Sequence, residues 1–331
     1  MIEENFTGDI LETTRKALCR LEGSYAIGVI CTKKDDELIA ARKESPLVIG
    51  LGERENYIAS DIPAILPFTK KIIFLENGEI ARLTKEKVEV FDLKGNPVTK
   101  TIETIDWGAK QAEKQGYPHF MLKEISEQPT AISDTIGDRM TEHDILLDEE
   151  IQKAIPNAAG LKRLIVVACG TSWHAGLIGE FMLEELAKIP TEVEYASEFR
   201  YRDPIITEGT AVIAVSQSGE TADTIAAIRE AKKKGAKVIS IVNVEGSTIA
   251  RESDAVLFTH AGPEIGVAST KAFTAQLTLI YLLTIYLAKK RGLLPQPQIS
   301  NRIRDIRKIP HQIQEILENQ DSIKRLAELF F

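Results

Sequence analysis

The sequence has 331 residues, which is enough for about two domains of ordinary size. Hydrophobic residues make up 44% and charged residues 27%, a balance that is typical of globular proteins and excludes a disordered or collagen-like chain. The net charge of −8 argues against nonspecific binding to nucleic acid or to an acidic membrane surface, so we expect neither kind of partner.

The three cysteines, Cys19, Cys31 and Cys169, form no CxxC pair. This argues against a disulfide framework and a zinc site, and it favours a reducing compartment. The first residues have no basic segment followed by an apolar core, so we expect no signal peptide. The sequence therefore predicts a cytoplasmic protein without a zinc site.

The first third of the chain reads as short strands between polar turns, preceded by a helix over residues 7–21. Alternating apolar residues separated by clusters of Gly, Asn, Asp and Lys are typical of antiparallel β structure. The expected strands cover residues 24–31, 37–41, 47–51, 57–60, 71–75, 80–83 and 88–92.

The composition turns polar and irregular over residues 99–118, where we expect a boundary between domains. Spaced apolar residues among charged ones predict helices over residues 119–140 and 148–159. We expect these helices to brace the domain that follows them.

Buried strands then alternate with helices, which predicts an α/β domain with a five-stranded, doubly wound parallel sheet of the flavodoxin-like order. The last helix, residues 270–291, contains an apolar run that is short for a membrane span and is interrupted by Thr and Gln, so we expect it to be buried. Residues 295–331 form a charged helical tail. The expected strands cover residues 163–168, 192–195, 210–215, 238–242 and 255–259, and the other helices residues 173–188, 222–234 and 247–252.

Polar loops follow the first and third strands of this sheet and run directly into helices. They consist of residues 169–172, Cys-Gly-Thr-Ser, and residues 216–221, Ser-Gln-Ser-Gly-Glu-Thr. In the flavodoxin-like order this is the point where strand order reverses and ligands bind. Hydroxyls, glycine and backbone N–H groups at a helix N-terminus can hold a phosphate without lysine. The alternative is that Ser and Thr only cap the helices.

The glycine spacing matches neither a dinucleotide fingerprint nor a P-loop. A third loop, residues 262–271, also opens a helix and can line the same pocket, or it can be a plain connection that Thr270 caps. Cys169 with His174 as its base is a weak candidate nucleophile, and packing explains a small thiol beside a glycine better.

Glu198, Arg200 and Arg202 follow the second strand, where we expect ion pairs more than ligand contacts. The remaining histidines have no metal-ligand spacing.

The motifs CGTS (residues 169–172), ASEFRYR (196–202), SQSGETADT (216–224) and EIGVASTKAFTAQL (264–277) resemble the family of glutamine-fructose-6-phosphate aminotransferases (isomerizing), or glucosamine-6-phosphate synthases. Upstream, SPLVIGLG (45–52), FLENGEIA (74–81) and HFMLKEISEQP (119–129) are similar to the same family. The resemblance covers essentially the whole chain.

The resemblance implies a protein of three parts, an N-terminal-nucleophile glutaminase domain followed by two sugar isomerase (SIS) domains. It assigns residues 1–98 to the antiparallel β half of a glutaminase type 2 domain and residues 99–154 to a linker with bracing helices. Residues 155–294 correspond to the first SIS domain, and residues 295–331 to a helical linker toward a second SIS domain. The family's contacts to the phosphate and sugar fall on Gly170, Thr171, Ser172, Ser216, Gln217, Ser218, Thr221 and, through its backbone, Val267.

The implied activity transfers the amide nitrogen of glutamine to fructose 6-phosphate and gives glucosamine 6-phosphate and glutamate, in hexosamine biosynthesis. It implies no metal or redox cofactor. The family's nucleophile is an N-terminal cysteine, whereas residue 2 here is isoleucine. Its glutamine-binding residues are expected before Met1, and the groups that open and isomerise the sugar after Phe331. The resemblance thus assigns no catalytic residue to this chain, which we expect to bind the sugar phosphate weakly and to be inactive alone.

The family's shared active sites imply a homodimer. The alternatives are a sugar-phosphate isomerase that acts without glutamine, a noncatalytic sugar-phosphate sensor, and a truncated product without function.

Overall fold

The chain divides into two compact units, Met1–Glu113 and Lys114–Phe331, in a computed structural model that describes residues 1–105 and 113–330. The division lies inside the predicted linker, residues 99–154, part of which falls outside the described residues. The domain limits inferred from the sequence remain predictions.

The first unit contains two antiparallel sheets with strand orders β1-β2-β6-β7-β8 and β4-β3-β5-β9. Their strands are β1 (Tyr25–Cys31), β2 (Lys34–Lys43), β3 (Val48–Leu51), β4 (Asn56–Ala59), β5 (Lys71–Phe74), β6 (Glu79–Leu83), β7 (Val88–Asp92), β8 (Pro97–Val98) and β9 (Glu103–Thr104).

Successive residues of β2 point to opposite faces of the first sheet and enter two different cores. Ala40 packs in a core with Ile49 and Ile73 of the second sheet, whereas Ile39 packs on the other side. There Ile39 packs against the buried face of α1 (Ile10–Leu18). The side chain of Asp9 caps the start of α1 by accepting a hydrogen bond from the Glu12 N–H at 3.1 Å. The unit thus has a core between its sheets and a second one under α1, preceded by the short η1 (Glu3–Asn5).

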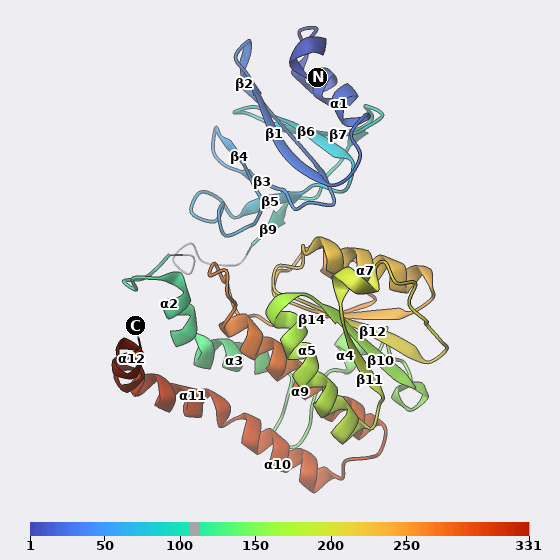
Figure 1. Ribbon diagram of the computed structural model, residues 1–331, viewed down its shortest axis with the longest axis vertical. Coiled ribbons are helices and arrows are strands. Elements are labelled where there is room, and N and C mark those ends of the chain that lie inside the picture. The colour runs from blue at the N-terminus through green and yellow to red at the C-terminus, as the bar shows by residue number, and fades with distance from the viewer. Residues whose placement is uncertain (106–112, 331) are drawn as a thin grey trace. The chain divides into compact units, whose positions relative to one another are not determined.

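The second unit contains a five-stranded parallel sheet with the order β11-β10-β12-β13-β14. In chain order within this sheet the arrangement is 2-1-3-4-5, so the predicted flavodoxin-like fold class is confirmed. Figure 1 shows α7 on one side of the sheet and α5 and α9 on the other. The strands are β10 (Arg163–Ala168), β11 (Thr191–Tyr195), β12 (Thr210–Ser216), β13 (Lys237–Val242) and β14 (Ala255–Phe258), and the three helices are α5 (Gly170–Met182), α7 (Ala222–Lys233) and α9 (Lys271–Lys290).

Both faces of the sheet are covered, because neighbouring residues of its strands alternate between two cores. Leu164 and Val166 pack with Leu279 of α9, whereas Ile165 and Val167 pack with Ile228 of α7. Strands buried on both faces are continuously apolar, which is the pattern that predicted a parallel sheet.

Helix α9 is the only helix in the described part of the chain that is long and apolar enough, by length and composition, to cross a membrane. In this structure 78% of its apolar window is buried within the protein. The sequence-based expectation of a buried helix agrees with this packing.

The predicted helix over residues 119–140 is divided into α2 (Phe120–Ser126) and α3 (Gln128–Ile136). Pro129 lies in the first turn of α3, where its missing N–H costs nothing, so a new helix begins there. The predicted helix over residues 148–159 is reduced to the short α4 (Asp148–Ile151) and η3 (Ala158–Gly160), and the short α6 (Ala196–Phe199) was not predicted. The predicted helix over residues 247–252 is present as α8 (Thr248–Glu252).

The predicted helical tail forms α10 (Gln296–Ile306), α11 (Ile309–Glu318) and α12 (Gln320–Glu328), and a π-helical turn, η4 (Leu183–Ala187), extends α5. Figure 1 shows the three tail helices following one another from α9 to the C-terminal end.

Candidate functional site

The predicted site loops leave the same edge of the parallel sheet. Ala168 is paired with Val215, so the loops after β10 and β12 begin side by side. Ser216 is paired with Val242 and Val242 with Phe258, which places the loops after β13 and β14 at the same edge. This edge includes the point between β10 and β12 where strand order reverses, the usual ligand position of such sheets.

Helix α5 begins at Gly170, three residues earlier than predicted, so Gly170, Thr171 and Ser172 form its first turn. Gly170 has φ +58°, a left-handed conformation that glycine adopts without strain. Cys169 occupies the N-cap position, and its side chain makes no capping hydrogen bond. The first N–H groups of an α-helix have no partner inside the helix, which makes this turn suited to an anion.

The loop of residues 216–221 is folded by its own hydroxyl groups. Ser216 Oγ accepts a hydrogen bond from the Gly219 N–H at 3.1 Å and lies 3.2 Å from Thr221 Oγ1. Ser218 Oγ accepts one from the Glu220 N–H at 3.2 Å. Thr221 is the N-cap residue of α7 but makes no side-chain capping bond. Simple capping therefore does not explain the hydroxyls of this loop.

This loop packs closely against the start of α8. Gly219 has φ +68°, and a Cβ atom built on it would lie 2.0 Å from Ser247 Oγ. The carboxylate of Glu220 accepts hydrogen bonds from the Thr248 N–H at 2.7 Å and from its hydroxyl at 3.0 Å. The loop is thus held against α8, and only glycine fits at position 219.

Buried amide side chains connect the loops to one another, and sequence reasoning missed them. The backbone N–H of Asn243 donates to the Gln217 carbonyl at 3.3 Å, and its side-chain Nδ2 donates to the Gly262 carbonyl at 2.6 Å. Gln276 Nε2 of α9 donates to Ser172 Oγ at 3.0 Å. Asn243 and Gln276 are 3% and 1% exposed. In the sequence, Gln276 stands out as a polar residue within the apolar run of α9, and Asn243 as the polar residue directly after the apolar strand β13.

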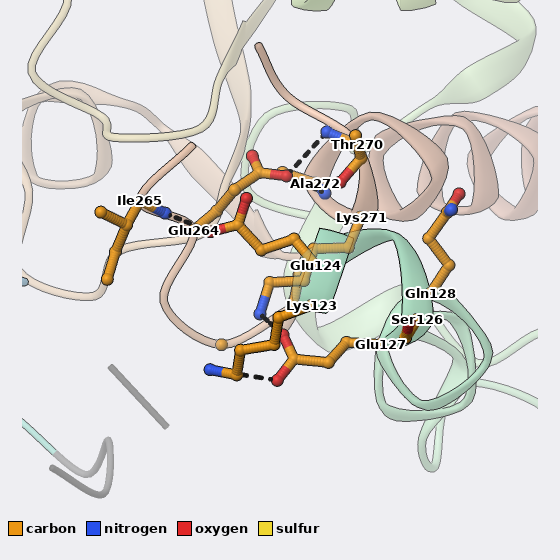
Figure 2. Close-up of polar contacts among 12 residues, drawn as sticks. Lys123, Glu124, Ser126, Glu127, Gln128, Glu264, Ile265, Thr270, Lys271 and Ala272 are labelled. Atoms are coloured by element: carbon orange, nitrogen blue, oxygen red, sulfur yellow. Dashed lines mark hydrogen bonds and ion pairs between the residues drawn. The ribbon is translucent and has the colours of Figure 1, made fainter. Parts of the chain in front are cut away.

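In the third loop a glutamate replaces the expected threonine cap. Thr270 is the N-cap residue of α9, but its side chain makes no capping bond. Instead Glu264 Oε1 accepts hydrogen bonds from the N–H groups of Thr270 at 2.8 Å and Ala272 at 3.2 Å. Figure 2 shows the Glu264 carboxylate at the start of α9. Of the two alternatives for this loop, the one in which the Thr270 side chain caps α9 is therefore not what the structure shows.

Val267 stands at the outermost part of this loop and is fully exposed, at 106%. The Asn243 contacts link the start of its loop to residues 216–221, and Gln276 links the following helix to Ser172. The structure therefore brings the three loops to one edge, while the ligand contacts of the eight site residues remain predictions.

The arginines after β11 form ion pairs within the second unit, as expected. Arg200 Nη1 lies 2.9 Å from Asp223 Oδ1, and Arg202 pairs with Glu194. These pairs are partly exposed. Since both arginines are paired with carboxylates, the candidate phosphate contacts are hydroxyl and backbone N–H groups.

The thiol of Cys169 has the environment of a packed residue. Burial raises the pKa of the Cys169 thiol above its ordinary value. The ring of its candidate base, His174, lies edge-on to Trp173 at 5.2 Å between ring centres. A raised pKa keeps the thiol neutral to higher pH, the opposite of what a nucleophile requires.

We therefore expect iodoacetamide at pH 7.5 to modify exposed Cys19 faster than Cys169. Only the thiolate reacts. Burial raises the pKa of the Cys169 thiol and thereby reduces the fraction of Cys169 that is thiolate. Peptide mass spectrometry at timed intervals measures both rates, with the chain unfolded in urea as the control. Faster labelling of Cys169 than of Cys19 in the folded chain would mean an activated nucleophile.

Comparison with known proteins agrees with this architecture. The SIS domain family matches residues 159–286. The chain is 47% identical over 327 residues to a protein of Caldanaerobacter subterraneus subsp. tengcongensis named glutamine-fructose-6-phosphate aminotransferase (isomerizing), covering 99% of this chain and 54% of the relative. A protein of the same name from Clostridium tetani is 49% identical over 329 residues, with the same coverage of both chains.

Among solved structures, the C-terminal domain of glucosamine-fructose-6-phosphate aminotransferase from Francisella tularensis superposes with a TM-score of 0.63 at 41% identity. The match covers 66% of this chain and 61% of that one. The chain thus spans about half the length of the curated relatives that it matches, at 54% of each.

Proposed function

We propose that this chain, which carries a SIS domain and is homologous along 99% of its length to glutamine-fructose-6-phosphate aminotransferases, holds the phosphate of fructose 6-phosphate in such an enzyme. The reaction would transfer the amide nitrogen of glutamine to the sugar and give glucosamine 6-phosphate and glutamate. Both units of the chain align with these relatives, which favours the aminotransferase over a lone isomerase or a sensor.

The observation that carries the proposal is a difference between the N-termini of the three helices that the predicted site loops open, α5, α7 and α9. The start of α9 is already occupied by the Glu264 carboxylate, whereas α5 and α7 begin without side-chain caps. A helix N-terminus favours negative charge through its dipole and its free N–H groups. A phosphate is therefore best placed between residues 170–172 and 216–221.

The roles proposed for individual residues follow from this placement. The first-turn N–H groups of α5, from Gly170 to Ser172, and the hydroxyls of Ser216, Ser218 and Thr221 would donate to phosphate oxygens. Hydrogen bonds to a charged acceptor contribute about 1.5–3 kcal/mol each. Gln217 and the backbone of Val267 would contact the sugar, since the Glu264 carboxylate at the start of α9 makes that loop unsuitable for a second anion.

The chemistry of the sugar would need groups that none of the assigned positions supplies. We propose that the 331-residue chain by itself binds the sugar phosphate without forming glucosamine 6-phosphate. Glutamine would be bound by a region outside it. We also propose a cytoplasmic homodimer without nucleic-acid or membrane partners. The net charge of −8 and the three free cysteines support the compartment and the absence of nucleic acid, whereas the dimer rests on the family resemblance.

Titration calorimetry of the 331-residue chain with fructose 6-phosphate tests the proposal, with free fructose and inorganic phosphate as controls. In a Ser218→Ala, Thr221→Ala variant we expect affinity to fall about 100-fold or more, since two bonds to a charged group are lost. A Thr130→Ala, Ser133→Ala variant, altered at exposed positions of α3, is the matched control and should bind normally. No binding by the unmodified chain, or equal binding by both variants, would contradict the proposed cradle.

A further inference from the structure

A cluster of buried charges lies between α2 and the loop that carries Val267. Lys123 and Glu124 of α2 are 2% and 1% exposed, and Glu264 and Lys271 on the other side are 7% and 3% exposed. Charged side chains are rarely buried this deeply unless they are paired and hydrogen-bonded, because desolvation of a charge is costly. The cluster therefore requires an explanation beyond its contribution to packing.

Glu124 binds the backbone of the loop from a helix about 140 residues earlier in the chain. Its Oε1 accepts hydrogen bonds from the N–H groups of Ile265 at 2.6 Å and Gly266 at 3.1 Å, and Oε2 lies 3.2 Å from the latter nitrogen. Figure 2 shows the Glu124 carboxylate directed at the nitrogen of Ile265. A Cβ atom at position 266 would lie 2.5 Å from Glu124 Oε2, so this approach requires glycine.

Glu127 fixes α2 itself to the beginning of α9. Its Oε2 lies 2.7 Å from Lys271 Nζ, and its Oε1 lies 3.3 Å from Lys123 Nζ. The two lysines balance part of the negative charge that Glu124, Glu127 and Glu264 bring into the interior. Helix α2 is thereby held at a fixed distance from the loop to which Glu124 is hydrogen-bonded.

The loop is anchored on both sides of Val267. Glu124 holds the N–H groups of Ile265 and Gly266 before it, and Glu264 holds those of Thr270 and Ala272 after it. Only the exposed tip between the two anchors faces outward. The conformation of the tip is therefore set by two buried carboxylates before any ligand arrives.

We propose that Glu124 is a positioning residue for the sugar portion of the substrate, acting through the backbone around Val267. This inference rests on the proposed function, in which the phosphate lies at α5 and α7 and the sugar reaches the third loop. Displacing the loop should weaken binding of a hexose phosphate and leave binding of inorganic phosphate unchanged, because the phosphate groups belong to other loops.

The first experiment needs no ligand and measures amide hydrogen exchange in the 331-residue chain. Glu124→Gln replaces one acceptor oxygen by an NH₂ group, so we expect exchange at Ile265 and Gly266 to become about tenfold faster or more. Glu142→Gln, at a side chain that is 85% exposed, is the control and should not change these rates. Unchanged exchange at both amides in the Glu124 variant would overturn the anchoring role.

The second experiment compares affinities for fructose 6-phosphate and inorganic phosphate by calorimetry. For Glu124→Gln we expect about tenfold weaker binding of the sugar phosphate and no change for inorganic phosphate. Gly266→Ala keeps the Glu124 side chain but forces its carboxylate away from the loop, so it should give the same selective loss. Circular dichroism checks that both variants are folded.

An equal loss of affinity for both ligands, or none for either, would overturn the positioning role. If the unmodified chain binds no fructose 6-phosphate, the proposed function fails as well, while the exchange data still show whether Glu124 anchors the loop.

Discussion

We expect the substitution Gly219→Ala to destabilise the second unit by about 2–5 kcal/mol and to abolish binding of the sugar phosphate. A left-handed backbone carrying a Cβ costs about 1–2 kcal/mol, and overpacking adds about 1–3 kcal/mol. Here the added methyl would lie 2.0 Å from Ser247 Oγ and 2.4 Å from its Cβ, so the loop of residues 216–221 must move away from α8. That displacement separates Ser216, Ser218 and Thr221 from one another.

Gly235→Ala is a matched control for this prediction. Gly235 also has a left-handed φ, +88°, but a Cβ there would meet no atom within 4 Å. Its substitution should destabilise the protein only through the strained left-handed backbone, by about 1–2 kcal/mol, and leave ligand binding intact. Urea unfolding of the two variants, followed by calorimetric titration of each, measures both effects. Equal destabilisation by the two substitutions would mean that the contact with Ser247 does not restrict the loop.

Much of the second unit could be predicted because its signals are local. Continuous apolar strands such as residues 163–168 and 210–215 are typical of a parallel sheet, and the polar loops that follow them identified the site edge.

In the first unit, two short strands were not predicted from the sequence. The strands β8 and β9 have two residues each and depend on pairing with β7 and β5, so no periodicity can reveal them.

The supporting shell of the site was less predictable, because its residues act over long distances in the sequence. Glu124 lies in a segment whose charges suggested a solvent-flanked helix, yet the residue is 1% exposed and its partners are more than 140 residues away. Asn243 follows an apolar strand without a motif of its own, and Gln276 lies within the motif of residues 264–277, which does not reveal its contact with Ser172. The residue types of a single sequence identify the loops that face the ligand. The side chains that hold these loops can be identified only from tertiary packing.

Of the three helices that the site loops open, α5 and α7 begin without a side-chain cap, whereas the Glu264 carboxylate lies at the start of α9. This carboxylate accepts hydrogen bonds from Thr270 and Ala272 N–H and from the Ser269 hydroxyl, the last at 2.7 Å. Glu264 therefore fixes the end of the Val267 loop, and under the proposed phosphate placement it would also keep phosphate away from α9.

Glu264→Ala should consequently destabilise the second unit by about 2–4 kcal/mol, since it leaves two amides and a hydroxyl without partners and removes a cap from α9. Glu264→Gln keeps an acceptor oxygen and should cost less, about 1 kcal/mol, mainly through the lost charge at the helix start. Ser269→Ala removes only one hydrogen bond and should also cost about 1 kcal/mol. Urea unfolding followed by circular dichroism measures this order.

The order of these three variants separates capping from packing. If Glu264 acts mainly by filling space, Gln should restore full stability and Ala alone should be affected. If the charge at the start of α9 matters, Gln should remain less stable than the unmodified chain, and the difference should shrink at high salt, because screening weakens a charge–dipole interaction at a helix end. A Gln variant that is as stable as the unmodified chain at all salt concentrations would contradict the electrostatic role of Glu264.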